Sequence, residues 1–307
     1  MPKYHVDRSI EIDASPDDAF QYVSDFTTWP KWSPWLCAEP DAEVVISEDS
    51  KSVGSKYSWS GEIVGVGEIE HLRLDPGHLI ENEIRFTKPW KAVSAVKFEF
   101  EPTTSGTKVT WHLDGSMPFF LFFLVEMTKT MLGMDYERGL KMLKERIETG
   151  NVESLVNIRG YESVGPLKMM GVRSSCSIDE IGPKMEAAIK AAYEKLSQAN
   201  LFEDTEGITV YHHLDMKAKR FDFTSGFLVD AAAETPDGLS SWSIPQISAL
   251  AVEHTGRYEH LGNAWSAGHR VVFGKRLKQL KVGTFEIYKN DPSKTPPEEL
   301  RVESSFR

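Results

Sequence analysis

The segment GTFEIY, which begins at residue 283, places a carboxylate between a hydroxyl and a phenol. Side chains alternate between the two faces of a strand, so Thr284, Glu286 and Tyr288 share one face and the two apolar residues share the other. Two interpretations are open at this point. Glu286 faces water, as most acids on half-buried strands do, or it is the one charged anchor of a cavity.

Other residues that could do chemistry form no recognisable pattern. Glu62, Glu68, Glu70 and Glu83 fall on alternating positions of expected strands and are expected to face solvent. His71, His78 and His112 are isolated, and the only two cysteines, Cys37 and Cys176, are far apart. The sequence therefore predicts no metal site, no disulfide framework and no cofactor, and the free cysteines are compatible with the cytoplasm.

Charge and hydropathy exclude several classes of function. The chain of 307 residues carries a net charge of −11, which argues against a broad nucleic-acid interface because phosphate contacts need clustered basic residues. The basic run Lys275–Lys281 is short and is expected to be a solvated helix face. No signal peptide is recognised at the N-terminus.

The most apolar stretch, MPFFLFFLVEM at residues 117–127, is too short to span a bilayer, which needs roughly 20 residues. We expect it to begin a helix whose apolar side faces a pocket or the core. A membrane-interface segment is the alternative interpretation.

The first half begins with an alternating strand at residues 6–12, followed by the helix signature ASPDDAFQYVSDF. Ser15 is the expected N-cap, Pro16 suits the first helical position, and Trp29-Pro30 is expected to end the helix. The three tryptophans of the next loop bury themselves from irregular backbone. Two interpretations remain open: a rim or lid over an apolar space, or a loop anchored in its own core.

Strand-like segments then follow one another up to a long helical pattern, which indicates an antiparallel meander closed by a C-terminal helix. The opening RSIEIDASPDDAFQYVSDFTTWPKWSPW resembles the START-like SRPBCC superfamily, in particular its polyketide-cyclase-type members. The resemblance covers residues 1–150 and implies a helix-grip fold with an apolar cavity. The residues expected to line this cavity are Trp29, Trp32, Trp35, Tyr57, Trp59, Trp111 and Phe122.

The second half contains a faint internal repeat. Val172 and Val252 are separated by 80 residues, as are Ile181 and Leu261, and each copy has the order strand, helix, strand, strand. Residues 150–166 are expected to be a linker running into a strand. Two such units would pack about a pseudo-twofold axis, with a pocket in the crease between them. The predicted fold class is therefore α+β in both halves.

The motifs VEHTGRYEHLGNAW and FEIYKNDPSKTPPEELRVE resemble the GyrI-like small-molecule-binding domain, the effector-binding domain of multidrug-sensing activators. The resemblance covers residues 155–307. It implies that the strand acid, here Glu286, lies in a pocket among aromatic residues and faces cationic or polar aromatic ligands.

The residues around Glu286 suit such a site. A buried carboxylate is costly unless it is hydrogen-bonded or paired, and Tyr288 or Tyr211 can donate a hydrogen bond to it. Aromatic faces from Trp265, Tyr258 and Trp242 would stack on a flat ligand and add cation–π attraction.

Three functions fit these features. The first is a binding protein for small hydrophobic or aromatic molecules, with one apolar site per domain. The second is a hydrolase of reactive, cyclopropane-type compounds, with Glu286 as general base and Tyr288 or Tyr211 as proton donor. The third is a protein-partner inhibitor that acts through its acidic surface. The sequence does not fix the oligomeric state.

Overall fold

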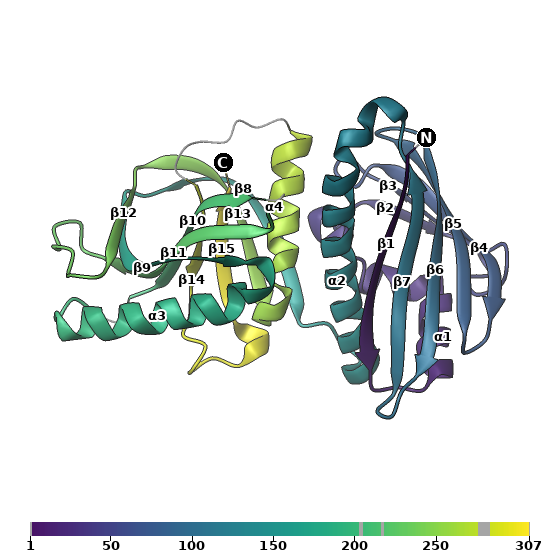
Figure 1. The fold of residues 1–307 in the computed structure, drawn as a ribbon, viewed down its shortest axis with the longest axis horizontal. Coiled ribbons are helices and arrows are strands. Elements are labelled where there is room, and N and C mark those ends of the chain that lie inside the picture. The colour runs from purple at the N-terminus through teal and green to yellow at the C-terminus, as the bar shows by residue number, and fades with distance from the viewer. Residues whose placement is uncertain (1, 203–204, 216–217, 276–282, 307) are drawn as a thin grey trace. The chain divides into compact units, whose positions relative to one another are not determined.

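The computed structural model describes residues 2–202, 205–215, 218–275 and 283–306, in two compact units, Met1–Val152 and Glu153–Arg307. Each unit contains one antiparallel sheet and its own helices, which confirms the predicted α+β class. Figure 1 shows both units, which are described separately below.

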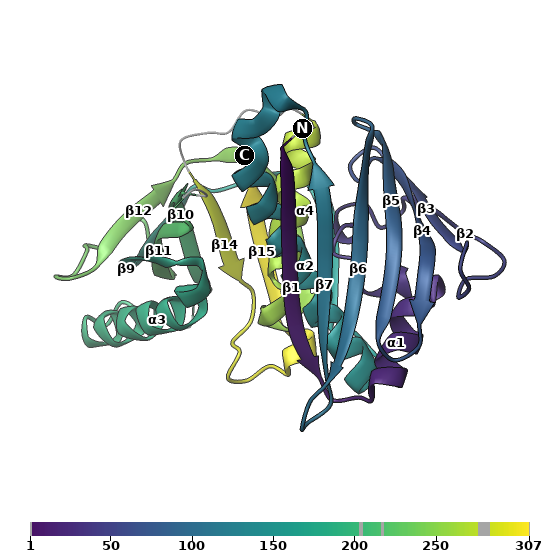
Figure 2. The same cartoon turned by 45° about the vertical axis from the view of Figure 1, so that its right-hand side comes forward.

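The N-terminal unit is a seven-stranded sheet in the order β1-β7-β6-β5-β4-β3-β2. Figure 2 shows these strands side by side, with α1 near one end of the sheet. Every neighbouring pair is antiparallel, so the predicted meander is confirmed. The elements in chain order are β1 (Lys3–Ile12), α1 (Pro16–Ser24), η1 (Phe26–Lys31), η2 (Leu36–Ala38), β2 (Glu43–Ile46), β3 (Lys56–Ser60), β4 (Val66–Asp75), β5 (Leu79–Lys88), β6 (Ala92–Pro102), β7 (Thr107–Ser116), η3 (Phe119–Leu124) and α2 (Val125–Thr149).

Helix α1 begins as predicted and ends earlier than predicted. The side chain of Ser15 accepts a hydrogen bond from the backbone N–H of Asp18. The helix stops at Ser24 rather than at Trp29-Pro30, because the side chain of Asp25 caps a new 3₁₀ helix, η1, that contains Pro30.

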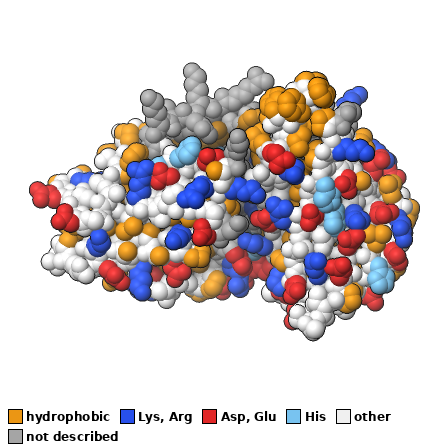
Figure 3. Space-filling model, in the orientation of Figure 1, with side chains coloured by type: hydrophobic (Ala, Val, Ile, Leu, Met, Phe, Trp, Pro, Cys, Tyr) orange, Lys and Arg blue, Asp and Glu red, His pale blue; other side chains and the backbone are white. Residues whose placement is uncertain are grey.

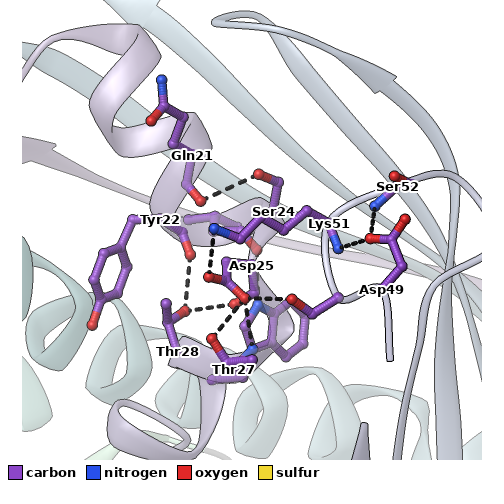
Figure 4. Close-up of polar contacts among 12 residues, drawn as sticks. Gln21, Tyr22, Ser24, Asp25, Thr27, Thr28, Asp49, Lys51 and Ser52 are labelled. Carbon is purple, nitrogen blue, oxygen red and sulfur yellow. Dashed lines mark hydrogen bonds and ion pairs between the residues drawn. The ribbon is translucent and has the colours of Figure 1, made fainter. Parts of the chain in front are cut away.

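Figure 4 shows the polar contacts around Asp25. Its carboxylate accepts hydrogen bonds from the Thr27 backbone and from the hydroxyls of Thr27 and Ser50, and it pairs with Lys51. Burial alone would raise the pKa of Asp25, but these bonds outweigh it and lower the pKa to about 2. The cap therefore remains charged at neutral pH and fixes the point at which η1 begins.

The C-terminal unit is an eight-stranded sheet in the order β12-β9-β11-β10-β14-β15-β13-β8. Its elements are β8 (Ser154–Val164), β9 (Leu167–Ser177), η4 (Ile178–Glu180), α3 (Ile181–Gln198), β10 (Gly207–Asp215), β11 (Arg220–Val229), β12 (Ser240–Ile244), β13 (Ile247–Gly256), η5 (Tyr258–His260), α4 (Gly262–Gly274), β14 (Thr284–Tyr288), η6 (Pro297–Glu299) and β15 (Arg301–Phe306). The expected linker at residues 150–166 is for the most part the strand β8. Of the basic run Lys275–Lys281, all but Lys275 lies outside the described residues.

The strand order confirms the internal repeat. β9-α3-β10-β11 and β13-α4-β14-β15 have the same element order, and the sheet order β9-β11-β10 is mirrored by β13-β15-β14. The strand before each copy pairs with the other copy: β8 pairs with β13, and β12 pairs with β9. The exchange ties the two halves into one sheet, and the pseudo-twofold axis passes between β10 and β14.

Candidate functional site

The centre of the C-terminal sheet carries a row of four buried polar side chains. Thr209 on β10 lies opposite Glu286 on β14 in the cross-strand register. Ser225 on β11 lies opposite Thr209, and Ser304 on β15 lies opposite Glu286. Directly opposed residues of antiparallel strands share a face, so the row crosses the sheet on one side. All four side chains are fully buried, which is unusual for polar groups at the middle of a sheet.

The row is symmetric about the pseudo-twofold axis. In the β10–β14 register, Thr209 faces Glu286, Tyr211 faces Thr284, and Gly207 faces Tyr288. The axis therefore relates Thr209 to Glu286 and Tyr211 to Tyr288. The two phenols reach the central position from opposite strands, and the repeat supplies two tyrosines for a single carboxylate.

The Glu286 carboxylate is fully buried and accepts three hydrogen bonds from described residues. The Tyr211 hydroxyl donates to Oε2 at 2.9 Å, and the Tyr288 hydroxyl donates to the same oxygen at 3.1 Å. The Trp265 Nε1 donates to Oε1. Glu286 is fully buried, so it does not face water. Burial is a requirement of the interpretation in which Glu286 anchors a ligand in a cavity.

Helix α4 brings Trp265 to this carboxylate. A Cβ at Gly268 would collide with the ring of Phe306 on β15, so the glycine lets the helix approach the sheet closely. The Trp265 ring packs edge-on against Tyr211, with the ring centroids 4.5 Å apart, and against Phe306 at 5.6 Å. From α3, Met185 lies 3.6 Å from the Tyr211 hydroxyl. The site is thus formed by strands from both copies and by a helix from each.

Burial raises the pKa of Glu286, and the hydrogen bonds from Trp265, Tyr211 and Tyr288 only partly counteract the rise. Burial and the nearby Glu286 charge raise the pKa values of Tyr211 and Tyr288 well above that of free tyrosine, so both remain protonated donors. The three donors to the carboxylate in the described part of the chain are uncharged. When Glu286 is ionised, the arrangement holds a buried negative charge that no described cation neutralises.

Tyr258 is the fourth aromatic residue near this charge. Its ring centroid lies 5.9 Å from that of Tyr288, and its hydroxyl is buried without a hydrogen-bond partner among the described residues. Burial and the charge of Glu286 raise the pKa of Tyr258 to about 12.

Trp242 lies elsewhere in the unit. It stacks edge-on against His212 at 4.6 Å and packs on the cluster that contains Phe285 and Ile287, the neighbours that alternate with Glu286. The structure therefore brings Tyr211, Trp265 and Tyr288 into contact with the carboxylate and Tyr258 against Tyr288, and it places Trp242 on the other face of the sheet.

In the N-terminal unit most of the predicted cavity residues belong to, or pack against, an aromatic core. Trp29 and Trp32 are buried members of that core, and their ring centroids are 5.3 Å apart, so the loop is anchored in its own core. Trp111 stacks on Tyr136 of α2 at 3.9 Å and on Phe98 of β6 at 5.0 Å. These contacts join the sheet, the loop and the helix.

The other four predicted cavity residues differ in their positions. Tyr57 is part of the same core, Trp59 packs against it, and Trp35 packs on Trp111 and donates from Nε1 to Asp135 at 2.9 Å. Phe122 is 60% exposed and contacts Phe119 and Phe123 instead of the core.

Comparison with known families agrees with these two architectures. Residues 3–148 match the family described as polyketide cyclase / dehydrase and lipid transport, and residues 162–306 match the GyrI-like small molecule binding domain. The chain joins a polyketide-cyclase-type SRPBCC domain to a GyrI-like domain. Both resemblances drawn from the sequence are thereby confirmed, and the protein carries two small-molecule-binding domains.

Three solved structures illustrate the similarity. A protein from Chromobacterium violaceum is 17% identical, with 47% of this chain and 96% of that chain covered and a TM-score of 0.38. The Aha1 dimer from Colwellia psychrerythraea is 19% identical, with 48% and 98% covered and a TM-score of 0.36. EcmrR in a complex with DNA is 17% identical, with 60% and 68% covered and a TM-score of 0.41. No curated protein sequence matches the chain.

Sequence reasoning missed the polar row of the GyrI-like domain. Thr209, Ser225 and Ser304 were not singled out, although Thr209 and Ser225 are hydrogen-bonded to each other at 2.8 Å. The signal was present in the tyrosines. The pseudo-twofold axis relates Tyr211 to Tyr288, which are 77 residues apart, whereas the offset expected from the sequence was 80. The helices of the two copies differ in length, so no constant offset holds along the repeat.

Proposed function

We propose that the GyrI-like domain binds aromatic cations and that Glu286 is the charged anchor of the ligand. The observation that carries this proposal is the fully buried carboxylate whose described donors are all neutral. An unpaired buried charge is costly, and a cation placed beside it would offset part of that cost through direct Coulomb attraction. Ligand binding, in this proposal, completes an incomplete ion pair.

The surrounding side chains favour a flat and aromatic cation. Trp265 and Tyr288 donate to the carboxylate and Tyr258 packs against Tyr288, so three aromatic rings that can attract a cation lie near the charge. The unpartnered Tyr258 hydroxyl offers one further hydrogen bond to a polar group of the ligand. For the SRPBCC domain the proposal extends only to the class of ligand, a small apolar molecule, because its predicted lining residues pack against one another. The whole chain would then sense, sequester or detoxify such compounds.

The test compares two ligands of nearly the same shape, N-methylacridinium and uncharged acridine, by isothermal titration at pH 8. We expect the cation to bind the full chain more tightly than acridine. Glu286→Gln removes the charge and keeps the shape, and it should weaken cation binding by about 2–4 kcal/mol, which is roughly 30-fold to several hundred-fold in Kd. Acridine affinity should change less than about threefold, since no charge pairing is lost.

The matched control is Glu298→Gln, which removes an exposed carboxylate from η6 and leaves the site intact. Equal affinities of Glu286→Gln and the parent protein for the cation would contradict the proposal, and so would an equal loss for both ligands.

Hydrolysis of an electrophilic ligand is the second candidate, because burial raises the pKa of Glu286 and two phenols adjoin it. Product formation from a strained cyclopropane substrate, measured by mass spectrometry and abolished by Glu286→Gln, would favour it. Turnover unchanged in that variant would remove Glu286 from the chemistry.

A further inference from the structure

One end of the SRPBCC domain exposes an unusual density of aromatic side chains. Phe119, Phe120, Phe122 and Phe123 occupy the 3₁₀ helix η3 and are each at least 60% exposed. We call this group the phenylalanine tip. Figure 3 shows hydrophobic side chains gathered at the end of the domain where η3 lies in Figure 1. The expectation that this stretch turns its apolar side to a pocket or core is therefore wrong for these four residues.

The geometry of a 3₁₀ helix explains why the rings point outward. With three residues per turn, positions three apart lie above one another. Phe119 stands over Phe122, with ring centroids 6.1 Å apart, and Phe120 stands over Phe123. Leu121 and Leu124 take the third direction and are half-buried. The leucines thus hold the turn on the domain while two columns of phenylalanine project away from it.

Two other chain segments meet at the same end of the sheet. The backbone N–H of Met117 donates to the carbonyl of Pro2, which places the chain start beside η3. The β5–β6 turn lies next to the end of β7. Strands β6 and β7 are antiparallel, and Ala95 near the start of β6 pairs with Asp114 near the end of β7. That turn carries Trp90, which is 69% exposed.

The charge of this end is opposite to the charge of the protein. Its three segments, residues 2–4, 88–93 and 117–131, contain Lys3, Lys88, Lys91 and Lys129 and a single acid, Glu126, for a net charge of +3. The whole chain has a net charge of −11. Trp90 lies between Lys88 and Lys91 in the sequence, an arrangement in which the ring reaches the acyl boundary and the ammonium groups reach lipid phosphates.

We propose that the phenylalanine tip and its lysines dock the SRPBCC domain onto a membrane surface that contains anionic lipid. A patch of this kind on a soluble fold marks an interaction site. The phenylalanine rings project from η3 in two directions. Lipid acyl chains can surround both columns of rings, whereas a flat protein surface would cover only one column. A second copy of this chain would bring the two sets of lysines together, which disfavours self-association.

The docking is interfacial. No helix among the described residues is long and apolar enough to cross a membrane.

The experiment is co-sedimentation of the full chain with vesicles of phosphatidylcholine alone or with about a quarter phosphatidylglycerol. We expect binding to the anionic vesicles that weakens as salt is raised. The double variant Phe122→Ser with Phe123→Ser should lower the partition coefficient at least about tenfold, because two exposed rings no longer enter the lipid. The double variant Lys88→Glu with Lys91→Glu should lose the preference for anionic vesicles.

The matched control replaces exposed apolar residues elsewhere in the same domain, Val53→Ser with Leu72→Ser, and should bind like the parent. Circular dichroism and thermal unfolding confirm that each variant folds, which is expected because the replaced side chains are exposed. The proposal is overturned if the parent does not bind anionic vesicles or if the phenylalanine variant binds equally well. A phenylalanine-dependent dimer of the parent in mass photometry would assign the tip to a second copy instead and would also overturn it.

Discussion

Replacing Glu286 by glutamine should stabilise the ligand-free protein at alkaline pH. Burial of a charge costs several kcal/mol, and each hydrogen bond to a charged acceptor returns about 1.5–3 kcal/mol. Because the pKa of Glu286 is raised in spite of its three hydrogen bonds, the cost of burial exceeds their return. Glutamine keeps the shape without the charge: its oxygen can accept from Trp265, and its NH2 group can donate to the oxygens of Tyr211 and Tyr288. The expected gain is on the order of 1 kcal/mol, or about 2–4 °C in Tm for a unit of this size.

The gain should depend on pH in a defined direction. The pKa of Glu286 is higher in the folded than in the unfolded chain, so the folded protein takes up the proton first as the pH falls. The parent therefore gains stability on acidification through the raised pKa, and the gain is complete below the unfolded value near 4.5. Glu286→Gln lacks this titration. Its advantage should be largest at pH 8 and should shrink toward pH 5.

Differential scanning calorimetry of the full chain measures this effect, with Glu298→Gln as the control for loss of one surface charge. A Glu286→Gln protein that is less stable than the parent at pH 8 would refute the reasoning, since the carboxylate would then stabilise the empty fold. An equal shift at pH 5 and pH 8 would show that the change in stability does not come from the charge.

Two further perturbations test the rest of the architecture. Trp111→Ala should lower the free energy of unfolding of the SRPBCC domain by about 3–5 kcal/mol, because the ring stacks on Tyr136 and Phe98 in the core. Trp90→Ala, at an exposed position, should change it by less than about 0.5 kcal/mol. Guanidinium unfolding followed by circular dichroism compares the two variants, and similar unfolding midpoints would contradict the described core. Burial and the charge of His260 lower the pKa of His254 from 6.5 to about 4, so the GyrI-like domain should lose stability as pH falls through that interval. His254→Gln should remove roughly 3 kcal/mol of this loss, measured by urea unfolding at pH 7.5 and 4.5, and an unchanged pH dependence would exclude His254 as its source.

Features of local structure could be predicted from the sequence. Ser15 and Pro16 predicted the start of α1, because an N-cap acts through its own side chain and the backbone of the next few residues. The capping box of Ser177 and Glu180 at the start of η4 is equally local, because the two residues are three positions apart. The sequence pattern predicted the antiparallel meander of the first sheet and the repeated order strand, helix, strand, strand of the second, but not the strands β2 and β12. The end of α1 was not predicted, since it depends on the contacts of Asp25 with Ser50 and Lys51 from a distant loop.

For the candidate site, sequence alone indicated Glu286 and the rings around it but not their partners. Strand alternation placed Glu286 on one face, and only cross-strand register shows that Thr209, Ser225 and Ser304 complete a buried row with it. Register depends on which strands pair and on the lengths of the connections between them, which periodicity does not encode. Trp242 illustrates the same limit, because its edge strand carries it to the other face.

The sequence by itself determined the two domain families, the α+β elements and the acid that the proposed function requires. Each of these can be recognised from residues that lie close together in the chain. Only the tertiary structure decided that the acid is fully buried with three neutral donors, and that four phenylalanines of the apolar stretch face outward. Burial is a property of what packs on a residue from elsewhere in the chain, so the same local pattern leads to a core in one place and to an exposed surface in another.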